Sequence, residues 1–300
     1  MPASEPKPES TAKPKAKSSL GKPDLITFGG LLLAIGGITG GLILEGGSVR
    51  DVTQVTAAII VLSGTIGAVM VTTPAAALRG ALMKLKYVFF TGTNDSGAAM
   101  EQVIEYATQA RRDGIVSLEK QANLIQDPFL KKALNLAVDG TDLQQIKKIM
   151  ELEISTFEQE GEAEAKVFEA AGGYAPTIGI IGAVLGLIQV MKNLADIDEV
   201  GHGIAVAFVA TVYGVGVANI FFLPAANKIK ARLHEQVQTK ELMLEGVLGI
   251  VEGLNPRLIR SKLEGFGSEP AAKESKAKGK DAKGKTKEAK PVAEAAAVEG

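Results

Sequence analysis

The sequence contains no cysteine and only two histidines, His202 and His234. Disulfides, thiolate-bound metals and cysteine nucleophiles are therefore excluded, and two imidazoles are too few for a zinc site built from histidine alone. The chain therefore has few of the side chains on which most enzymatic catalysis depends. We therefore predict a protein that is not an enzyme and that holds neither a metal nor a cofactor.

Charge is absent from long parts of the chain, although 22% of all residues are charged. Apolar residues make up 46% of the total and are gathered into blocks. The net charge of −1 averages these blocks with densely charged ones. The charge balance therefore gives no indication of a nucleic-acid partner, and we predict none.

Four blocks without a single charged residue are each close to the roughly 20 residues that a helix needs to cross a bilayer. They cover 25–44, 52–73, 174–191 and 203–223. The first two are joined by the short segment 45–51 and the last two by 192–202. This spacing predicts two transmembrane hairpins in contact with lipid.

Basic residues flank these blocks unequally. Lysines and arginines cluster in 13–22, in 79–86 and in 228–232, whereas the two hairpin turns hold only Arg50 and Lys192. Since segments rich in lysine and arginine stay on the cytoplasmic side, we predict that both termini and the segment between the hairpins are cytoplasmic.

The predicted fold is an all-α membrane protein with four transmembrane helices in two hairpins, an inserted cytoplasmic helical domain, and long helices extending from the third and fourth spans. Capping and breaking residues in the inserted domain predict helices over 96–114, 115–126 and 128–140, and a long one that continues into the third span. The predicted parts are a disordered leader (1–23), hairpin 1 (24–74), the inserted domain (75–173), hairpin 2 (174–224), a cytoplasmic helix (225–267) and a disordered Lys/Ala-rich tail (268–300).

Ionisable residues are missing from all four blocks away from their ends. Proteins that move protons or ions normally hold such a group near the middle of the membrane. Either another chain supplies that group, or the protein is a passive membrane scaffold. Taken singly, the hydroxyls of Thr177, Thr211 and Tyr213 favour packing against neighbouring helices over lining a wet path.

Small residues and prolines mark other features of the spans. Gly36 with Gly40, and Gly182 with Gly186, have the small-xxx-small spacing that lets helices approach closely, which favours an oligomer. Pro176 and Pro224 bracket the second hairpin. Each removes a helix hydrogen bond and is expected to act as a kink or a hinge.

Several motifs resemble the MotA/PomA flagellar stator subunits of the MotA/TolQ/ExbB proton channel superfamily. They are DLITFGGLLLAIGGI, GGSVRDVTQVTAAIIVLSGTIGAVMV, RRDGIVSLE, YAPTIGIIGAVLGLIQVM and VAFVATVYGVGVANIFFLPAANKIK. The resemblance covers about residues 24 to 255, and the four spans favour the stator branch over ExbB and TolQ relatives. It implies a bacterial inner-membrane protein, not an enzyme, that couples ion flow to torque.

Ion-pathway and coupling roles also follow from the resemblance. Thr211 matches the family's fourth-span threonine, which faces an aspartate of the MotB-type partner, with Thr177 and Tyr213 as secondary candidates. Pro176 and Pro224 match the prolines that couple ion passage to motion of the cytoplasmic domain.

The resemblance further implies contacts and a transported ion. Arg111 and Glu119 match the charged pair that engages the rotor protein FliG. Family members form homopentamers around two MotB chains. Ala183 and Ala210 stand where sodium-driven relatives often carry threonine, so a proton is expected in preference to sodium. The competing hypotheses are an ExbB/TolQ-like energiser of a periplasmic or outer-membrane partner, and the passive scaffold.

Overall fold

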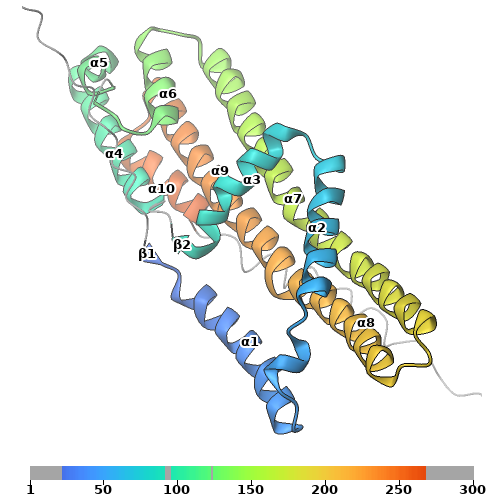
Figure 1. Cartoon of the computed structure of the whole chain (residues 1–300). Coiled ribbons are helices and arrows are strands. Elements are labelled where there is room, and N and C mark those ends of the chain that lie inside the picture. Colours follow the sequence, from blue (N-terminus) through green and yellow to red (C-terminus); the bar gives the residue numbers. More distant parts are fainter. Residues whose placement is uncertain (1–21, 92–95, 123, 268–300) are drawn as a thin grey trace, which may run out of the picture. The chain divides into compact units, whose positions relative to one another are not determined.

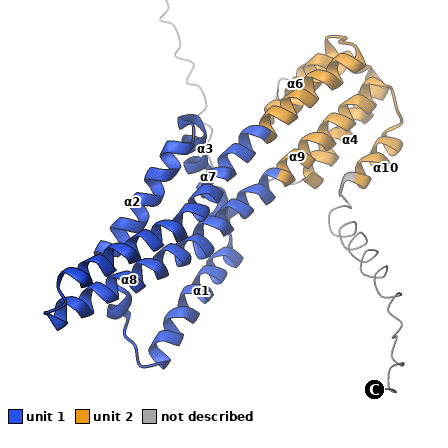
Figure 2. Ribbon diagram, turned by 90° about the vertical axis from the view of Figure 1, so that its right-hand side faces the viewer, with its two compact units in different colours: residues 1–93, 159–233 blue, residues 94–158, 234–300 orange. Residues whose placement is uncertain are grey.

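The computed structural model describes residues 22–91, 96–122 and 124–267, and almost all of them are helical (Figure 1). The predicted tail and residues 1–21 of the predicted leader lie outside the described residues, whereas Lys22 and Pro23, the last two residues of that leader, form the short strand β1. The chain divides into two compact units, one within Met1–Thr93 and Gln159–Leu233 and the other within Asn94–Glu158 and His234–Gly300 (Figure 2). Each unit is therefore assembled from two separate stretches of the sequence.

The helices and short strands follow one another with brief connections. They are β1 (Lys22–Pro23), α1 (Leu25–Leu44), η1 (Val49–Val52), α2 (Val55–Thr72), α3 (Ala75–Phe89), β2 (Phe90–Thr91), α4 (Ser96–Asp113), η2 (Ile115–Leu118), α5 (Glu119–Ala122), α6 (Pro128–Val138), α7 (Leu143–Lys192), α8 (Ile197–Val217), η3 (Ala218–Phe222), α9 (Leu223–Val251) and α10 (Pro256–Gly267). The all-α fold class predicted from the sequence is confirmed.

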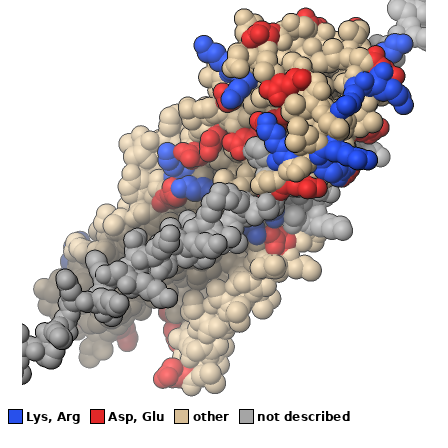
Figure 3. All heavy atoms as spheres, turned by 180° about the vertical axis from the view of Figure 1, so that it is seen from behind, with Lys and Arg blue, Asp and Glu red and all other residues tan. Residues whose placement is uncertain are grey.

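Four helical segments among the described residues are long and apolar enough to span a membrane: Leu25–Leu44, Val49–Thr72, Leu143–Lys192 and Ile197–Val251. On the face drawn in Figure 3, charged side chains gather over one part of the surface and are sparse over the remainder. An apolar surface of this kind is stable in lipid, which solvates it without the cost of exposure to water.

The first unit contains α1, α2, α3, α8 and the adjoining parts of α7 and α9. Small and branched side chains form its cores. One cluster joins α2 to α8 through Ala57, Val61, Val209 and Ala210. A second cluster joins α3 to α7 and α9, with Phe168 and Ile229 among its members. By contrast, α1 has no buried residue, so its own chain covers little of it.

The start of α1 is nevertheless held firmly within the first unit. The Asp24 backbone N–H donates to the Phe89 carbonyl at 2.9 Å, beside the two-residue antiparallel pairing of β1 with β2. The Asp24 carboxylate caps α1 by accepting from the Thr27 N–H at 3.2 Å. It also binds Lys228 Nζ at 2.6 Å and an Arg232 guanidinium nitrogen at 3.4 Å. The Lys228 hydrogen bond, opposed in part by burial, lowers the pKa of Asp24.

The second unit has an ordinary water-soluble core. Phe129, Leu134, Met150 and Leu263 are completely buried, so α6, α7 and α10 each contribute apolar side chains to the interior of this unit. The Asp127 carboxylate caps α6 by accepting from two backbone N–H groups at 2.9 and 3.0 Å. These are the features expected of a packed helical domain, and they match the amphipathic pattern of its sequence.

Two predicted helices differ from those observed. The helix expected over 115–126 is a 3₁₀ turn (η2) followed by the four-residue α5. Gly114 adopts a φ of 83° and ends α4, and its carbonyl is then bound by the Ser117 hydroxyl at 2.6 Å. The single helix expected over 225–267 is broken into α9 and α10, because Gly253 adopts a φ of 70° in the connection between them.

Candidate functional site

A close helix contact in the first unit joins α7 to α8 through glycine and alanine. A Cβ atom added to Gly186 would lie 2.8 Å from the Ala207 nitrogen and from the Gly203 oxygen. One added to Gly182 would lie 2.8 Å from Ala210 Cβ. Gly186 therefore lies against the backbone of α8, and Gly182 lies against the Ala210 methyl group. Only small residues allow this approach.

The other predicted glycine pair has a different setting. Gly36 and Gly40 on α1 have nothing within 4 Å of an added Cβ. They are exposed or only half-buried in the single chain. Their predicted role in helix packing therefore has no counterpart within this chain, and it stays a prediction about contacts with another chain.

The two predicted pathway threonines lie on neighbouring helices. Thr211 on α8 is half-buried, and its hydroxyl donates to the Ala207 carbonyl at 3.3 Å. Thr177 on α7 is exposed and donates to the Tyr174 carbonyl at 2.8 Å. Both hydroxyls bond to their own helix, which satisfies their donors and leaves oxygen lone pairs able to accept from or coordinate a cation.

Tyr213, the third pathway candidate, connects α8 to the start of α2. Its hydroxyl donates to the Val52 carbonyl at 2.6 Å and accepts from the Gln54 N–H at 3.2 Å. Gln54 is the residue that precedes α2. The hydroxyl therefore satisfies two backbone groups at a helix end, which gives it a structural role. Its place on the ion pathway stays a prediction.

Replacing Tyr213 by phenylalanine tests this role. We expect a loss of about 1–3 kcal/mol in stability, because two backbone groups in an apolar setting lose their partner. Thermal unfolding of the detergent-purified protein measures it. Tyr174→Phe is the matched control, since the Tyr174 hydroxyl makes no hydrogen bond to another described residue. Equal stability of the two variants would contradict the structural role.

The two predicted coupling prolines occupy different surroundings. Pro176 lies inside α7, which continues on both sides of it. Pro224 follows the π-helical turn η3, in which the Leu223 N–H bonds to the Ala218 carbonyl five residues earlier. A proline has no N–H to bond to the carbonyl four residues back, and a π turn accommodates that loss. The fourth span is therefore irregular at η3, where the sequence offered only Pro224 as a signal.

The predicted rotor-contact residues lie in the second unit. Arg111 is in the last turn of α4 and Glu119 is at the start of α5, and both are exposed. Between them, Arg112 binds Asp113 at 2.8 Å, and this hydrogen bond lowers the pKa of Asp113. Because Arg112 and Asp113 neutralise one another, Arg111 carries the net charge that this turn presents to a partner.

No group of three or more His, Asp or Glu residues able to hold a metal ion occurs among the described residues. One stretch of the tail, 279–286, matches the phosphate-loop pattern G-x-x-x-x-G-K-[ST] but lies outside the described residues. The run SKAKGKDAKGKTK that contains it has no apolar strand before the pattern, which a nucleotide-binding loop requires. The match reflects Lys/Gly-rich composition.

Comparison with known proteins decides the family. Residues 121–242 match the MotA/TolQ/ExbB proton channel family. Motility protein A of Bacillus subtilis (strain 168) is 36% identical over 238 residues, which cover 78% of this chain and 87% of that protein. The chain belongs to the motility protein A (MotA/PomA) branch of this family.

Solved structures of this branch share the whole fold. A C. jejuni MotAB structure matches with a TM-score of 0.78 and 35% identity, over 82% of this chain and 98% of that chain. The flagellar MotAB stator complex from Bacillus subtilis matches with a TM-score of 0.75 and 34% identity, over 84% and 98%. Membership of the family makes this chain a multi-pass inner-membrane protein that is not an enzyme.

Proposed function

We propose that the chain is the ion-conducting subunit of a flagellar stator, which couples proton flow across the inner membrane to torque on the rotor. The observation that carries the proposal is the lack of any ionisable residue inside the four apolar spans of a chain that belongs to a proton channel family. A conducted cation needs a carboxylate at that depth. The similar solved structures are MotAB complexes, and a MotB-type subunit is the partner that would supply it.

The proposed mechanism begins with a proton that binds the partner's aspartate beside Thr211. Neutralising that carboxylate removes its need for polar neighbours and changes how its helix fits against α7 and α8. Pro176 and the irregular turn before Pro224 are the places where these helices bend most easily. Repeated binding and release, in a ring of several copies, moves the Arg111 and Glu119 surface against the rotor protein FliG.

The proposed orientation places both termini and the second unit in the cytoplasm. It is supported by the basic residues that follow α2 and η3, namely Arg79, Lys84, Lys86, Lys228, Lys230 and Arg232. Because the chain has no cysteine, single cysteines introduced into 45–51 or 115–120 report orientation without background. A membrane-impermeant thiol reagent added to intact spheroplasts should label the first segment and not the second.

Complementation tests the function itself. The chain and its MotB-type partner, produced in a strain without stators, should restore swimming. A protonophore should abolish that swimming, and sodium concentration should have no effect on it. If swimming depends on the sodium concentration and continues in the presence of the protonophore, the transported ion is sodium and not the proton. Failure to swim with any MotB-type partner, together with rescue of an ExbB- or TolQ-deficient strain, would favour the energiser instead.

Charge reversal tests the rotor surface. We expect Arg111→Glu combined with Glu119→Lys to reduce swimming severely while membrane levels stay normal, since both side chains are exposed and distant charges steer fast, reversible contacts. Swarm diameter and immunoblots of membranes measure the two effects.

The matched control exchanges another exposed pair in the second unit. On α7, Lys147 Nζ lies 3.9 Å from Glu151 Oε1. Lys147→Glu with Glu151→Lys therefore keeps an ion pair at these positions and leaves the total charge unchanged. This control should swim normally. Normal swimming of the Arg111/Glu119 variant would remove those two residues from the rotor surface.

A further inference from the structure

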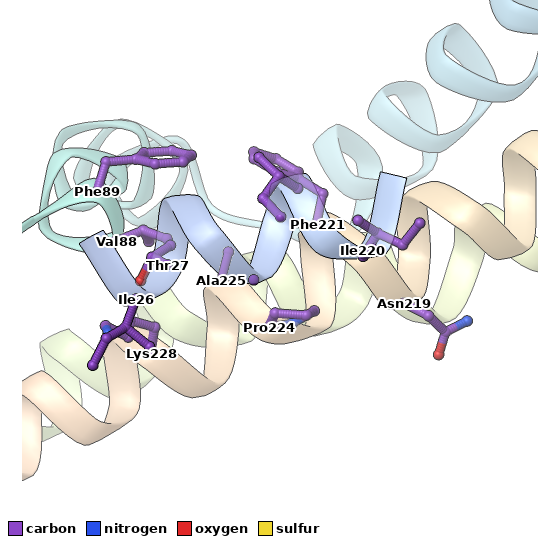
Figure 4. Close-up of a pocket in the computed structure, with 13 residues that line it drawn as sticks. Ile26, Thr27, Val88, Phe89, Asn219, Ile220, Phe221, Pro224, Ala225 and Lys228 are labelled. Carbon is purple, nitrogen blue, oxygen red and sulfur yellow. The ribbon is translucent and has the colours of Figure 1, made fainter. Parts of the chain in front are cut away.

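A cavity of about 320 Å³ lies within the first unit beside the start of α1. Its walls come from three places: the first turns of α1, the end of α3, and the irregular turn η3 with the first turns of α9 (Figure 4). None of the residues proposed for the ion pathway lines it. The cavity therefore lies apart from the predicted ion-pathway residues, but it shares Pro224 and the turn η3 with the predicted coupling region.

The lining is apolar except at its ends. Of the 13 lining residues only Thr27, Asn219 and Lys228 have polar side chains. Figure 4 shows Lys228 near Ile26 at one end of the cavity and Asn219 at the other. Apolar cavities of this kind do not hold ordered water, so an apolar molecule is the fitting occupant.

The polar end lies where the membrane span begins. Lys228 binds Asp24, the residue immediately before the apolar helix α1, at 2.6 Å. The remaining lining of α1, from Gly30 to Ala34, lies deeper in the span. The cavity therefore extends from the depth of the lipid headgroups, where the Lys228 ammonium group lies, into the hydrocarbon region.

The dimensions select a single hydrocarbon chain over a helix. Asn219 and Lys228 are nine residues apart on a helical stretch, which corresponds to a length of about 13 Å. A volume of about 320 Å³ over that length leaves a cross-section of about 25 Å². A helix about 10 Å across has a cross-section of about 80 Å², so a helix from a second copy could cover the cavity but could not enter it.

We propose that this cavity binds one acyl chain of a phospholipid from the leaflet in which α1 begins, with the lipid phosphate at the Lys228 ammonium group. The phosphate shares Lys228 with the Asp24 carboxylate, which also contacts Arg232 at 3.4 Å. The acyl chain lies against Phe221 and Pro224, which line the cavity. Because α1 packs only loosely in this chain and has no buried residue, the bound lipid fills the space between α1 and the irregular turn.

Filling the cavity tests the proposal. Gly30 lines it and has nothing within 4 Å of an added Cβ, so the side chain of Gly30→Leu begins in open space and is expected to fill part of the cavity. Gly37 on the same helix has equally open surroundings but does not line the cavity, so Gly37→Leu is the matched control. Both variants keep the Asp24 and Lys228 contacts.

The measurement uses the complete complex with its partner, in vesicles of phosphatidylethanolamine and phosphatidylglycerol that contain phosphatidylglycerol with a photoreactive acyl chain. We expect labelled peptides from 26–34 and 219–228, at least fivefold less label there in Gly30→Leu, and unchanged label in Gly37→Leu. A diacylglycerol with the same photoreactive chain should label these segments several-fold less, since it has no phosphate.

Three results would overturn the proposal. Label in these segments that is equal in wild type and Gly30→Leu would show that the cavity does not hold the chain. If diacylglycerol labels these segments as strongly as phosphatidylglycerol does, the cavity does not recognise the phosphate. Disulfide-linked dimers of Ala34→Cys, formed in the complex, would show that a second copy of the chain covers the cavity instead.

Discussion

Replacing Thr211 by isoleucine is expected to slow rotation severely in cells that depend on this chain. Isoleucine is β-branched like threonine, so the branching at Cβ is kept while the hydroxyl is replaced by an apolar ethyl group. The hydroxyl bonds weakly to Ala207, at 3.3 Å, and is proposed to face the partner's aspartate. Losing one such polar contact in an apolar site costs about 1–3 kcal/mol, which slows ion passage by about 5- to 150-fold.

Swimming speed and proton uptake by cells with the Thr211 variants measure this effect. Thr211→Ser keeps the hydroxyl and should retain most of the activity. Thr39→Ile changes another intramembrane threonine, whose hydroxyl bonds to the Ile35 carbonyl at 2.8 Å, and should leave proton uptake unchanged. If Thr211→Ile and Thr39→Ile conduct equally well, Thr211 does not face the ion.

Gly214→Ala is expected to have the second large effect, on assembly rather than on conduction. An added Cβ would lie 2.5 Å from the Ala175 carbonyl oxygen and 3.0 Å from Gly179 Cα. Both neighbours are backbone atoms, so only a separation of α7 from α8 can relieve the overlap. Overpacking of this kind costs about 1–3 kcal/mol or more, and we expect the protein to be degraded or to melt at a much lower temperature.

Gly216→Ala provides the matched control two residues further along α8. A Cβ added there has nothing within 4 Å. Membrane abundance and thermal unfolding in detergent should be close to wild type for Gly216→Ala and clearly reduced for Gly214→Ala. Wild-type abundance and unfolding of Gly214→Ala would show that α7 and α8 are not in backbone contact at this level.

The membrane character of the chain could be read from residue types alone. The apolar block 25–44 became α1 without a change of either end, because its charge-free length and Asp24 at its start leave few alternatives. The function could also be inferred from the family motifs, which lie in the spans and in the turn around Arg111. Connections that depend on local backbone conformation were predicted less well, as the region around Gly114 shows.

Other parts of the proposed site were invisible in the sequence. The sequence shows that Tyr213 carries a hydroxyl, but only the structure shows that this hydroxyl bonds to the Val52 carbonyl just before α2. The π turn η3 has no residue pattern of its own beyond Pro224. The ion pair of Asp24 with Lys228 joins residues more than two hundred positions apart.

The sequence by itself determined which segments enter lipid, because a run of about 20 residues without charge has no stable alternative to a buried or membrane helix, and it determined the family. Only the tertiary structure decided which faces of those helices meet. Close approach of α7 and α8 depends on backbone atoms that face each other across two segments, and the cavity beside α1 depends on three segments that leave a space between them. Neither is a property of any one segment.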